Sequence, residues 1–129
     1  MKKILNLLLI TMVLVSTTLG AFALNFEQGF AQVHRKPLVV LIYAKWADNY
    51  QSTLQQYRSV RALMSDVYNF VELDLASPDA RAYTEKFQIN PKLPYIMVFR
   101  DGGKISRYLQ RDCASSASCV KSKLKTFIQ

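Results

Sequence analysis

Apolar residues between positions 26 and 33 recur at the spacing of a helix. Phe26, Phe30 and Val33 are three to four positions apart, which predicts an amphipathic helix over 25–35. Asn25 precedes the first of them and is expected to cap the helix through its side-chain oxygen. This segment is therefore expected to bury one face against the rest of the protein.

Four later segments have the apolar pattern of β-strands. Leu38-Val-Val-Leu-Ile-Tyr43 is an unbroken apolar run, which is typical of a strand that is buried on both faces of a sheet. Asp101-Gly102-Gly103 has the composition of a hairpin turn between the last two strands. The predicted strands span residues 38–43, 69–74, 95–100 and 104–109.

Helical spacing of apolar residues returns between these strands and after the last of them. Ser77 is expected to cap the middle helix, with Pro78 in the first turn, where its missing N–H costs nothing. A helix between the first two strands makes them parallel, and the last two strands form an antiparallel hairpin. We therefore predict an α/β fold, with a mixed four-stranded sheet that carries helices on both faces. The predicted helices span residues 47–66, 78–87 and 117–128.

The N-terminal residues have the three parts of a secretory signal peptide. Two lysines precede an apolar stretch, and small residues lead to Ala21-Phe22-Ala23. We therefore predict a signal peptide over 1–23, cleaved after Ala23, and one domain over 24–129. The expected location is the bacterial periplasm, or outside the cell as a secreted protein. The alternative is a retained membrane anchor, because residues 4–23 are long enough to span a bilayer.

Composition limits the kinds of function that this chain can have. It has 129 residues, of which 50% are apolar and 12% are aromatic, which excludes a disordered or low-complexity chain. The formal net charge is +8, but the basic residues are scattered, and Lys121, Lys123 and Lys125 alternate around the last helix. We therefore expect no nucleic-acid partner. A single histidine, His34, excludes a His-rich metal site, and we predict no metal and no cofactor.

Two stretches of the chain resemble the thioredoxin fold. Residues 38–46 form a buried strand that runs into Trp46 at the start of a long helix. Residues 87–104 combine the end of a helix, Pro94, a strand and a glycine-containing turn. In this order and spacing, they resemble thioredoxin-like proteins over roughly residues 38–109. The resemblance implies the three-layer arrangement of that fold.

The chain departs from this family at the residues that carry its chemistry. The resemblance implies Cys-x-x-Cys directly after Trp46, where a helix N-terminus stabilises the attacking thiolate. This chain has Ala47-Asp48-Asn49-Tyr50 there, and Leu41 where the family often carries a buried acid that moves protons. The sequence therefore predicts a redox-inactive member of the family, without dithiol exchange at this site.

The sequence retains residues of the family's recognition surface. Pro94 matches the cis-proline whose loop offers backbone groups to an extended peptide beside the tryptophan. The resemblance therefore implies that the vestigial active-site surface binds a peptide or partner protein by strand addition. The alternative is that Trp46 and Pro94 only maintain the fold. The predicted binding residues are Trp46, Ala47, Asp48, Asn49, Tyr50, Leu93 and Pro94.

The two cysteines, Cys113 and Cys119, lie between the last strand and the last helix. In an oxidising compartment they are expected to form a disulfide. One interpretation is a structural bond that fixes this small, polar loop to the helix. The other is a thiol–disulfide oxidoreductase or redox sensor that uses this pair, because the corresponding loop of the family borders the peptide groove.

Overall fold

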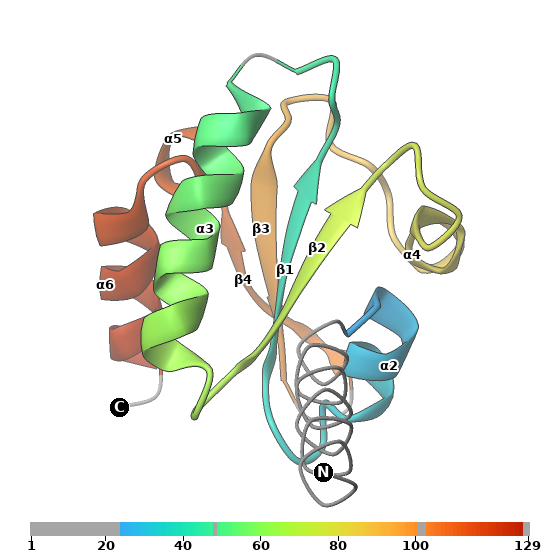
Figure 1. The fold of residues 1–129 in the computed structure, drawn as a ribbon. Helices are drawn as coiled ribbons and strands as arrows, with labels where there is room; N and C mark the ends of the chain where they lie inside the picture. Colours follow the sequence, from blue (N-terminus) through green and yellow to red (C-terminus); the bar gives the residue numbers. More distant parts are fainter. Residues whose placement is uncertain (1–23, 48, 101–102, 128–129) are drawn as a thin grey trace, which may run out of the picture.

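The computed structural model describes residues 24–47, 49–100 and 103–127, and the predicted signal peptide lies outside them. The elements follow the predicted order, with one short helix added near the C-terminus (Figure 1). Within the described residues, no helix is both long enough and apolar enough to cross a bilayer. The elements, in chain order, are α2 (Phe26–Ala31), β1 (Leu38–Tyr43), α3 (Tyr50–Met64), β2 (Asn69–Asp74), α4 (Ala80–Lys86), β3 (Tyr95–Phe99), β4 (Ile105–Leu109), α5 (Arg111–Ala114) and α6 (Ala117–Phe127).

The four strands form one mixed sheet in the order β2-β1-β3-β4. β1 pairs with β2 in parallel and with β3 in antiparallel orientation, and β3 and β4 form an antiparallel hairpin. Figure 1 shows α3 and α6 on one face of the sheet, with α2 and α4 on the other. The predicted α/β class, mixed four-stranded sheet and flanking helices are therefore confirmed.

β1 is buried along its whole length, as its apolar run predicts. Leu38 and Ile42 belong to the core on the α2/α4 face, whereas Val39 and Leu41 belong to the core on the α3/α6 face. Because successive side chains of a strand point to opposite faces, this one strand contributes to both cores. The end of β1 is thereby held in a fixed position within the sheet.

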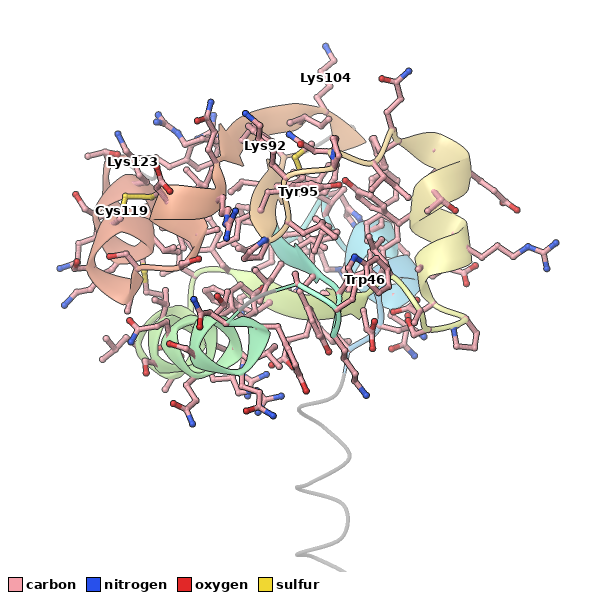
Figure 2. All side chains as sticks on the ribbon, turned by 90° about the horizontal axis from the view of Figure 1, so that it is seen from above. Trp46, Lys92, Tyr95, Lys104, Cys119 and Lys123 are labelled. Atoms are coloured by element: carbon pink, nitrogen blue, oxygen red, sulfur yellow. A yellow bond between two sulfur atoms is a disulfide. The ribbon has the colours of Figure 1, made fainter. Side chains whose placement is uncertain are left out.

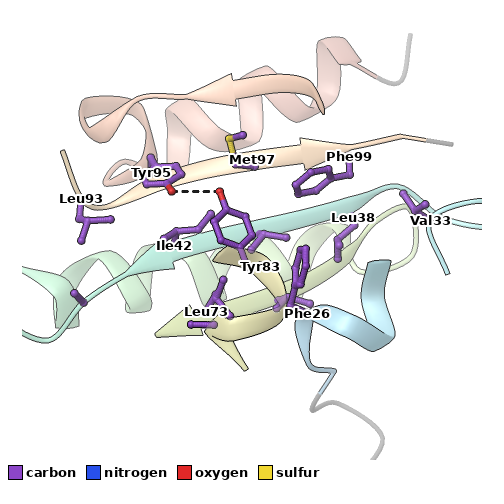
Figure 3. Packing of buried hydrophobic residues seen from close by; sticks show 14 residues of the cluster. Phe26, Val33, Leu38, Ile42, Leu73, Tyr83, Leu93, Tyr95, Met97 and Phe99 are labelled. Atoms are coloured by element: carbon purple, nitrogen blue, oxygen red, sulfur yellow. Dashed lines mark hydrogen bonds between the residues drawn. The ribbon is translucent and has the colours of Figure 1, made fainter. Parts of the chain in front are cut away.

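Aromatic rings fill much of the core on the α2/α4 face (Figure 3). The centroid of the buried Phe26 ring lies 5.5 Å from that of Phe30 and 5.3 Å from that of Tyr83. Gly103 has a φ of +71°, and a Cβ there would come within 2.6 Å of the Phe30 ring. Glycine is therefore required at this position both for conformation and for space. The other residues of the predicted turn, 101–102, lie outside the described residues.

Both helices on this face differ from the predicted bounds. α2 begins after Asn25 as predicted, and the Asn25 side chain accepts a hydrogen bond from the first turn, but the helix ends at Ala31 rather than at 35. The prediction that Ser77 caps the next helix is wrong, because α4 begins at Ala80. Ser77 instead donates both its N–H and its hydroxyl to the Asp74 carbonyl. These two bonds close a turn that delays the start of the helix.

On the α3/α6 face, buried tyrosine hydroxyls are hydrogen-bonded to backbone carbonyls. The Tyr57 hydroxyl lies 2.8 Å from the carbonyl oxygens of both Val39 and Val71, which belong to neighbouring strands. Burial raises the pKa of Tyr57 well above its ordinary value. The Tyr68 hydroxyl donates to the Leu124 carbonyl of α6 at 2.8 Å. Both tyrosine side chains are therefore buried with their hydroxyls hydrogen-bonded.

Candidate functional site

The end of β1 and the start of β3 lie side by side at one end of the sheet. Ile42 is paired with Tyr95 in the antiparallel ladder, so the residues that follow β1 meet those that precede β3. Trp46 follows β1, and Leu93 and Pro94 precede β3. The strand register therefore brings together two segments that are far apart in the sequence.

Trp46 is 70% exposed and projects from this end of the protein (Figure 2). The next residue, Ala47, donates its N–H to the Ala44 carbonyl at 3.0 Å, which closes a turn around the tryptophan. Ala47 is partly buried and packs against the core cluster that contains Leu93. The exposed indole therefore projects from a turn that packs against the core. Because the side chain has few rotatable bonds, fixing it on binding costs little conformational entropy.

α3 begins at Tyr50, three residues later than the sequence predicts. Asn49, directly before it, has the left-handed conformation with a φ of 63°, which asparagine tolerates better than most residues. Thr53 donates its N–H to the Asn49 carbonyl at 3.0 Å and so starts the helix. The free N–H groups of the first turn therefore follow Asn49. The predicted binding residue Asp48 lies outside the described residues.

Tyr50, the first residue of α3, is held by an aromatic contact. Its ring stacks on that of Tyr43, with 6.2 Å between the centroids and 7° between the planes. Burial, and after it the negative charge of Asp74, raises the pKa of Tyr43. The Tyr43 ring gives Tyr50 an apolar surface on which to pack.

The loop before β3 is hydrogen-bonded to tyrosine hydroxyls of two strands. Asn90 donates its backbone N–H to the Tyr95 hydroxyl of β3 at 3.3 Å, and its side-chain amide to the Tyr108 hydroxyl of β4. The Tyr95 hydroxyl also lies 3.2 Å from the Tyr83 hydroxyl of α4 (Figure 3). These positioning residues could not be predicted from the sequence, because no local pattern shows that distant tyrosines meet at one loop.

Leu93 and Pro94 are both buried, and the peptide bond between them is cis. Leu93 belongs to the core cluster on the α2/α4 face. The side chain of Leu93 therefore serves the core, and the apolar group that this end of the sheet exposes is the Trp46 ring.

The predicted disulfide between Cys113 and Cys119 is present, with 5.2 Å between the two Cα atoms. The prediction that Cys113 lies in a loop is wrong, because it belongs to α5, whereas Cys119 lies in α6, within the helix predicted over 117–128. α5 has four residues, which is too short to show a helical period in the sequence. Between the cysteines, Ser115 accepts a hydrogen bond from the Thr53 hydroxyl at 3.3 Å. The disulfide therefore joins two helices beside the first turn of α3.

A polar groove adjoins the loop before β3, between that loop and the start of α5. Lys92 and Arg111 line it, together with Asp112. Within the part of the chain that the structure describes, no three acidic, histidine or cysteine side chains form a group suited to a metal ion. His34 is exposed on the surface. This end of the molecule therefore offers an aromatic ring, backbone groups and charged side chains to a partner.

No protein-family model and no curated protein matches this chain, but solved structures do. A chain of the complex between ferredoxin:thioredoxin reductase and thioredoxin f2 is 14% identical, with a TM-score of 0.65 over 83% of this chain and 94% of that chain. The germline-specific thioredoxin Deadhead of Drosophila melanogaster is 12% identical, with a TM-score of 0.62 over 78% and 90% of the two chains. Oxidised mitochondrial thioredoxin 3 of Saccharomyces cerevisiae is 18% identical, with a TM-score of 0.57 over 79% and 90%. The chain has a thioredoxin-like fold.

The segment that joins β1 to α3 contains no cysteine. It ends in Trp46-Ala-Asp-Asn, and Tyr50 is the first residue of the helix. The only two cysteines of the chain are bonded to each other on α5 and α6. At identities of 12–18% the similarity extends to the fold, so the function rests on the residues of this chain.

Proposed function

We propose that this protein is an exported thioredoxin-like domain that binds a peptide or partner protein around Trp46, without dithiol exchange there. The observation that carries the proposal is the 70% exposed Trp46 ring, on the segment that follows β1 at the end of the sheet where β1 pairs with the start of β3. Tryptophan is enriched among the residues that dominate binding energy at protein interfaces. The signal-peptide pattern over 1–23 supports a periplasmic or secreted location.

The residues around Trp46 favour noncovalent binding over exchange. Dithiol exchange needs one thiolate to attack and a second thiol to resolve the mixed disulfide. Ala47 and Tyr50 stand where the family carries these thiols, and the buried Leu41 offers no group that carries a proton. A bound segment would therefore be held by the Trp46 ring and by backbone groups, and released without any change of covalent bonds.

Trp46→Ala is expected to weaken binding of an unfolded polypeptide about 30-fold, because tryptophan hot spots contribute about 2 kcal/mol. The probe is a reduced, alkylated model protein that carries a fluorescent label, and anisotropy gives its Kd. Leu63→Ala is the matched control, because Leu63 is 65% exposed on the same helix as Tyr50 but about 20 Å along it. Equal Kd values for Trp46→Ala and the unchanged protein, with both folded, would contradict the proposal.

One contact favours a second candidate function, a thiol–disulfide oxidoreductase or redox sensor based on Cys113 and Cys119. The hydrogen bond from Thr53 to Ser115, at 3.3 Å, places the disulfide-bearing segment beside the start of α3. In that reaction a dithiol substrate would give two electrons and two protons to the disulfide. Cys113 and Cys119 would be left as thiols, and the substrate would gain a disulfide.

The reduction potential of the pair distinguishes these functions. We expect a structural bond with a potential below about −300 mV, because Cys113 and Cys119 lack the close Cys-x-x-Cys spacing of exchange enzymes. The purified protein is equilibrated in defined thiol–disulfide buffers, and the free thiols are then alkylated and counted by mass. A potential near that of the strongest periplasmic oxidants, about −120 mV, would favour the oxidoreductase instead.

A further inference from the structure

The net positive charge of the predicted domain lies in its C-terminal part. Residues 24–87 carry seven Lys and Arg and seven Asp and Glu, whereas residues 88–129 carry eight Lys and Arg and two Asp. The second group spans β3, β4, α5, α6 and the loops between them. The domain is therefore balanced in charge around β2 and α4, and basic around β4.

Cations on the β4 side extend into solvent. Lys104 and Lys123 are both exposed, and in Figure 2 both lie away from Trp46. All the ion pairs found among the described residues involve cations that precede residue 88. The charges on the β4 side are therefore accessible to anionic groups from another molecule.

α6 continues this basic surface beside β4. The guanidinium carbon of Arg100 lies 4.2 Å from the Phe127 ring centroid, and Arg100 donates to the Phe127 carbonyl at 3.0 Å. Arg107 of β4 lies over the same ring, at 5.8 Å. Lys123 is one helical turn before Phe127, so it lies on the face of α6 that is directed toward β4.

β4 is also an open edge of the sheet. It pairs with β3 alone, and no other backbone group of the described residues is hydrogen-bonded to 105–109. Two apolar side chains of this strand, Ile105 and Tyr108, are 45% and 36% exposed. An open edge presents N–H and C=O groups to which a further strand can pair.

From the charge and the open edge together, we propose that β4 binds an acidic, extended segment of a partner protein as an added strand. Backbone hydrogen bonds hold the segment along β4, and its carboxylates pair with cations such as Lys104 and Lys123. A second copy of this chain fits poorly, because two β4 edges would bring like charges together. An anionic membrane would use the charges but not the backbone edge. The cations of this surface lie away from Trp46, and the proposal does not rest on binding there.

The test uses a fluorescein-labelled peptide of alternating Glu and Thr, about eight residues long, with anisotropy measured at low ionic strength. The double variant Lys104→Glu/Lys123→Glu is expected to weaken binding about tenfold or more, because each reversal replaces an attraction by a repulsion. Arg35→Glu/Arg81→Glu is the matched control, since it changes the net charge equally through exposed residues of the charge-balanced part. An equal loss in both double variants would overturn the proposal.

Two further probes separate strand addition from charge alone. The same peptide with alternate backbone amides N-methylated keeps every carboxylate but loses edge hydrogen bonds, and is expected to bind about tenfold more weakly. Equal binding of both peptides would overturn the proposal. So would binding to phosphatidylglycerol vesicles that is tighter than peptide binding and equally sensitive to the change at Lys104 and Lys123. Trp46→Ala is expected to bind the acidic peptide normally, and a loss there would show that the two surfaces are one.

Discussion

At pH 7, Leu41→Asp is expected to lower the free energy of unfolding by about 4 kcal/mol or more. Leu41 is 0% exposed and belongs to the apolar cluster on the α3/α6 face. The Tyr57 hydroxyl on that face is already hydrogen-bonded to the carbonyls of Val39 and Val71. A carboxylate at this position would therefore be buried without a partner. Where the thioredoxin resemblance implies a buried acid, this protein has a closed apolar core.

The loss of stability in Leu41→Asp is expected to depend on pH. Burial favours the neutral acid, so the pKa of the introduced carboxyl in the folded protein lies above its unfolded value of about 3.9. Between these two pKa values the folded state binds more protons than the unfolded state, and stability therefore falls as the pH rises. Urea denaturation at about pH 4 and about pH 7 measures the difference.

Leu41→Asn is the control for this experiment, because it changes the packing similarly but carries no titratable group. Its stability should change little between the two pH values relative to the unchanged protein. If Leu41→Asp is as stable as Leu41→Asn at pH 7, this position accepts a charged acid, and the interpretation of the core around it is wrong.

Phe26→Ala is expected to destabilise the protein by about 3–5 kcal/mol, which is a large part of the stability of a small domain. The Phe26 side chain is 1% exposed and touches aromatic rings of α2, α4 and β3, so truncation leaves a cavity at the centre of the α2/α4 face. Thermal and urea denaturation measure the loss. Phe26→Leu, which keeps most of the volume, should cost less than about 1.5 kcal/mol.

The exposed residue Leu63 provides the reference for this second prediction. Leu63→Ala should change stability by no more than about 0.5 kcal/mol, because the side chain is already in solvent. Equal stabilities for Phe26→Ala and Leu63→Ala would mean that α2 is not packed on the sheet through Phe26.

The main elements of the fold could be predicted because their patterns are local. The unbroken apolar run of β1 indicates burial on both faces, and the two cores that share this strand account for it. The first residues of the helices were less predictable, because they depend on hydrogen bonds that the spacing of apolar residues does not show. Ser77 has the side chain of a helix cap, but its bonds to the Asp74 carbonyl close a turn instead. At α3, the turn closed by Ala47 and the left-handed Asn49 delay the helix in the same way.

The candidate site could be predicted only in part. The sequence identifies Trp46 and Pro94 by their resemblance to one family, but the pairing of Ile42 with Tyr95 shows how near their segments lie. Burial also divides residues that the sequence groups together, since Leu93 faces the core whereas Trp46 faces solvent. The basic surface around β4 could not be predicted from the sequence. Its cations are scattered along the chain and come together only because α6 lies beside β4.

Trp46 is the only tryptophan of the chain and is 70% exposed, so its fluorescence reports on the candidate site alone. The decisive measurement is the emission of Trp46, with acrylamide quenching, during titration with a reduced and alkylated model protein that lacks tryptophan. If the domain binds extended chains at this site, the emission shifts to shorter wavelength and quenching falls, with the Kd that anisotropy gives. If anisotropy shows binding while the emission and quenching of Trp46 stay unchanged, the partner binds elsewhere and the central claim is wrong.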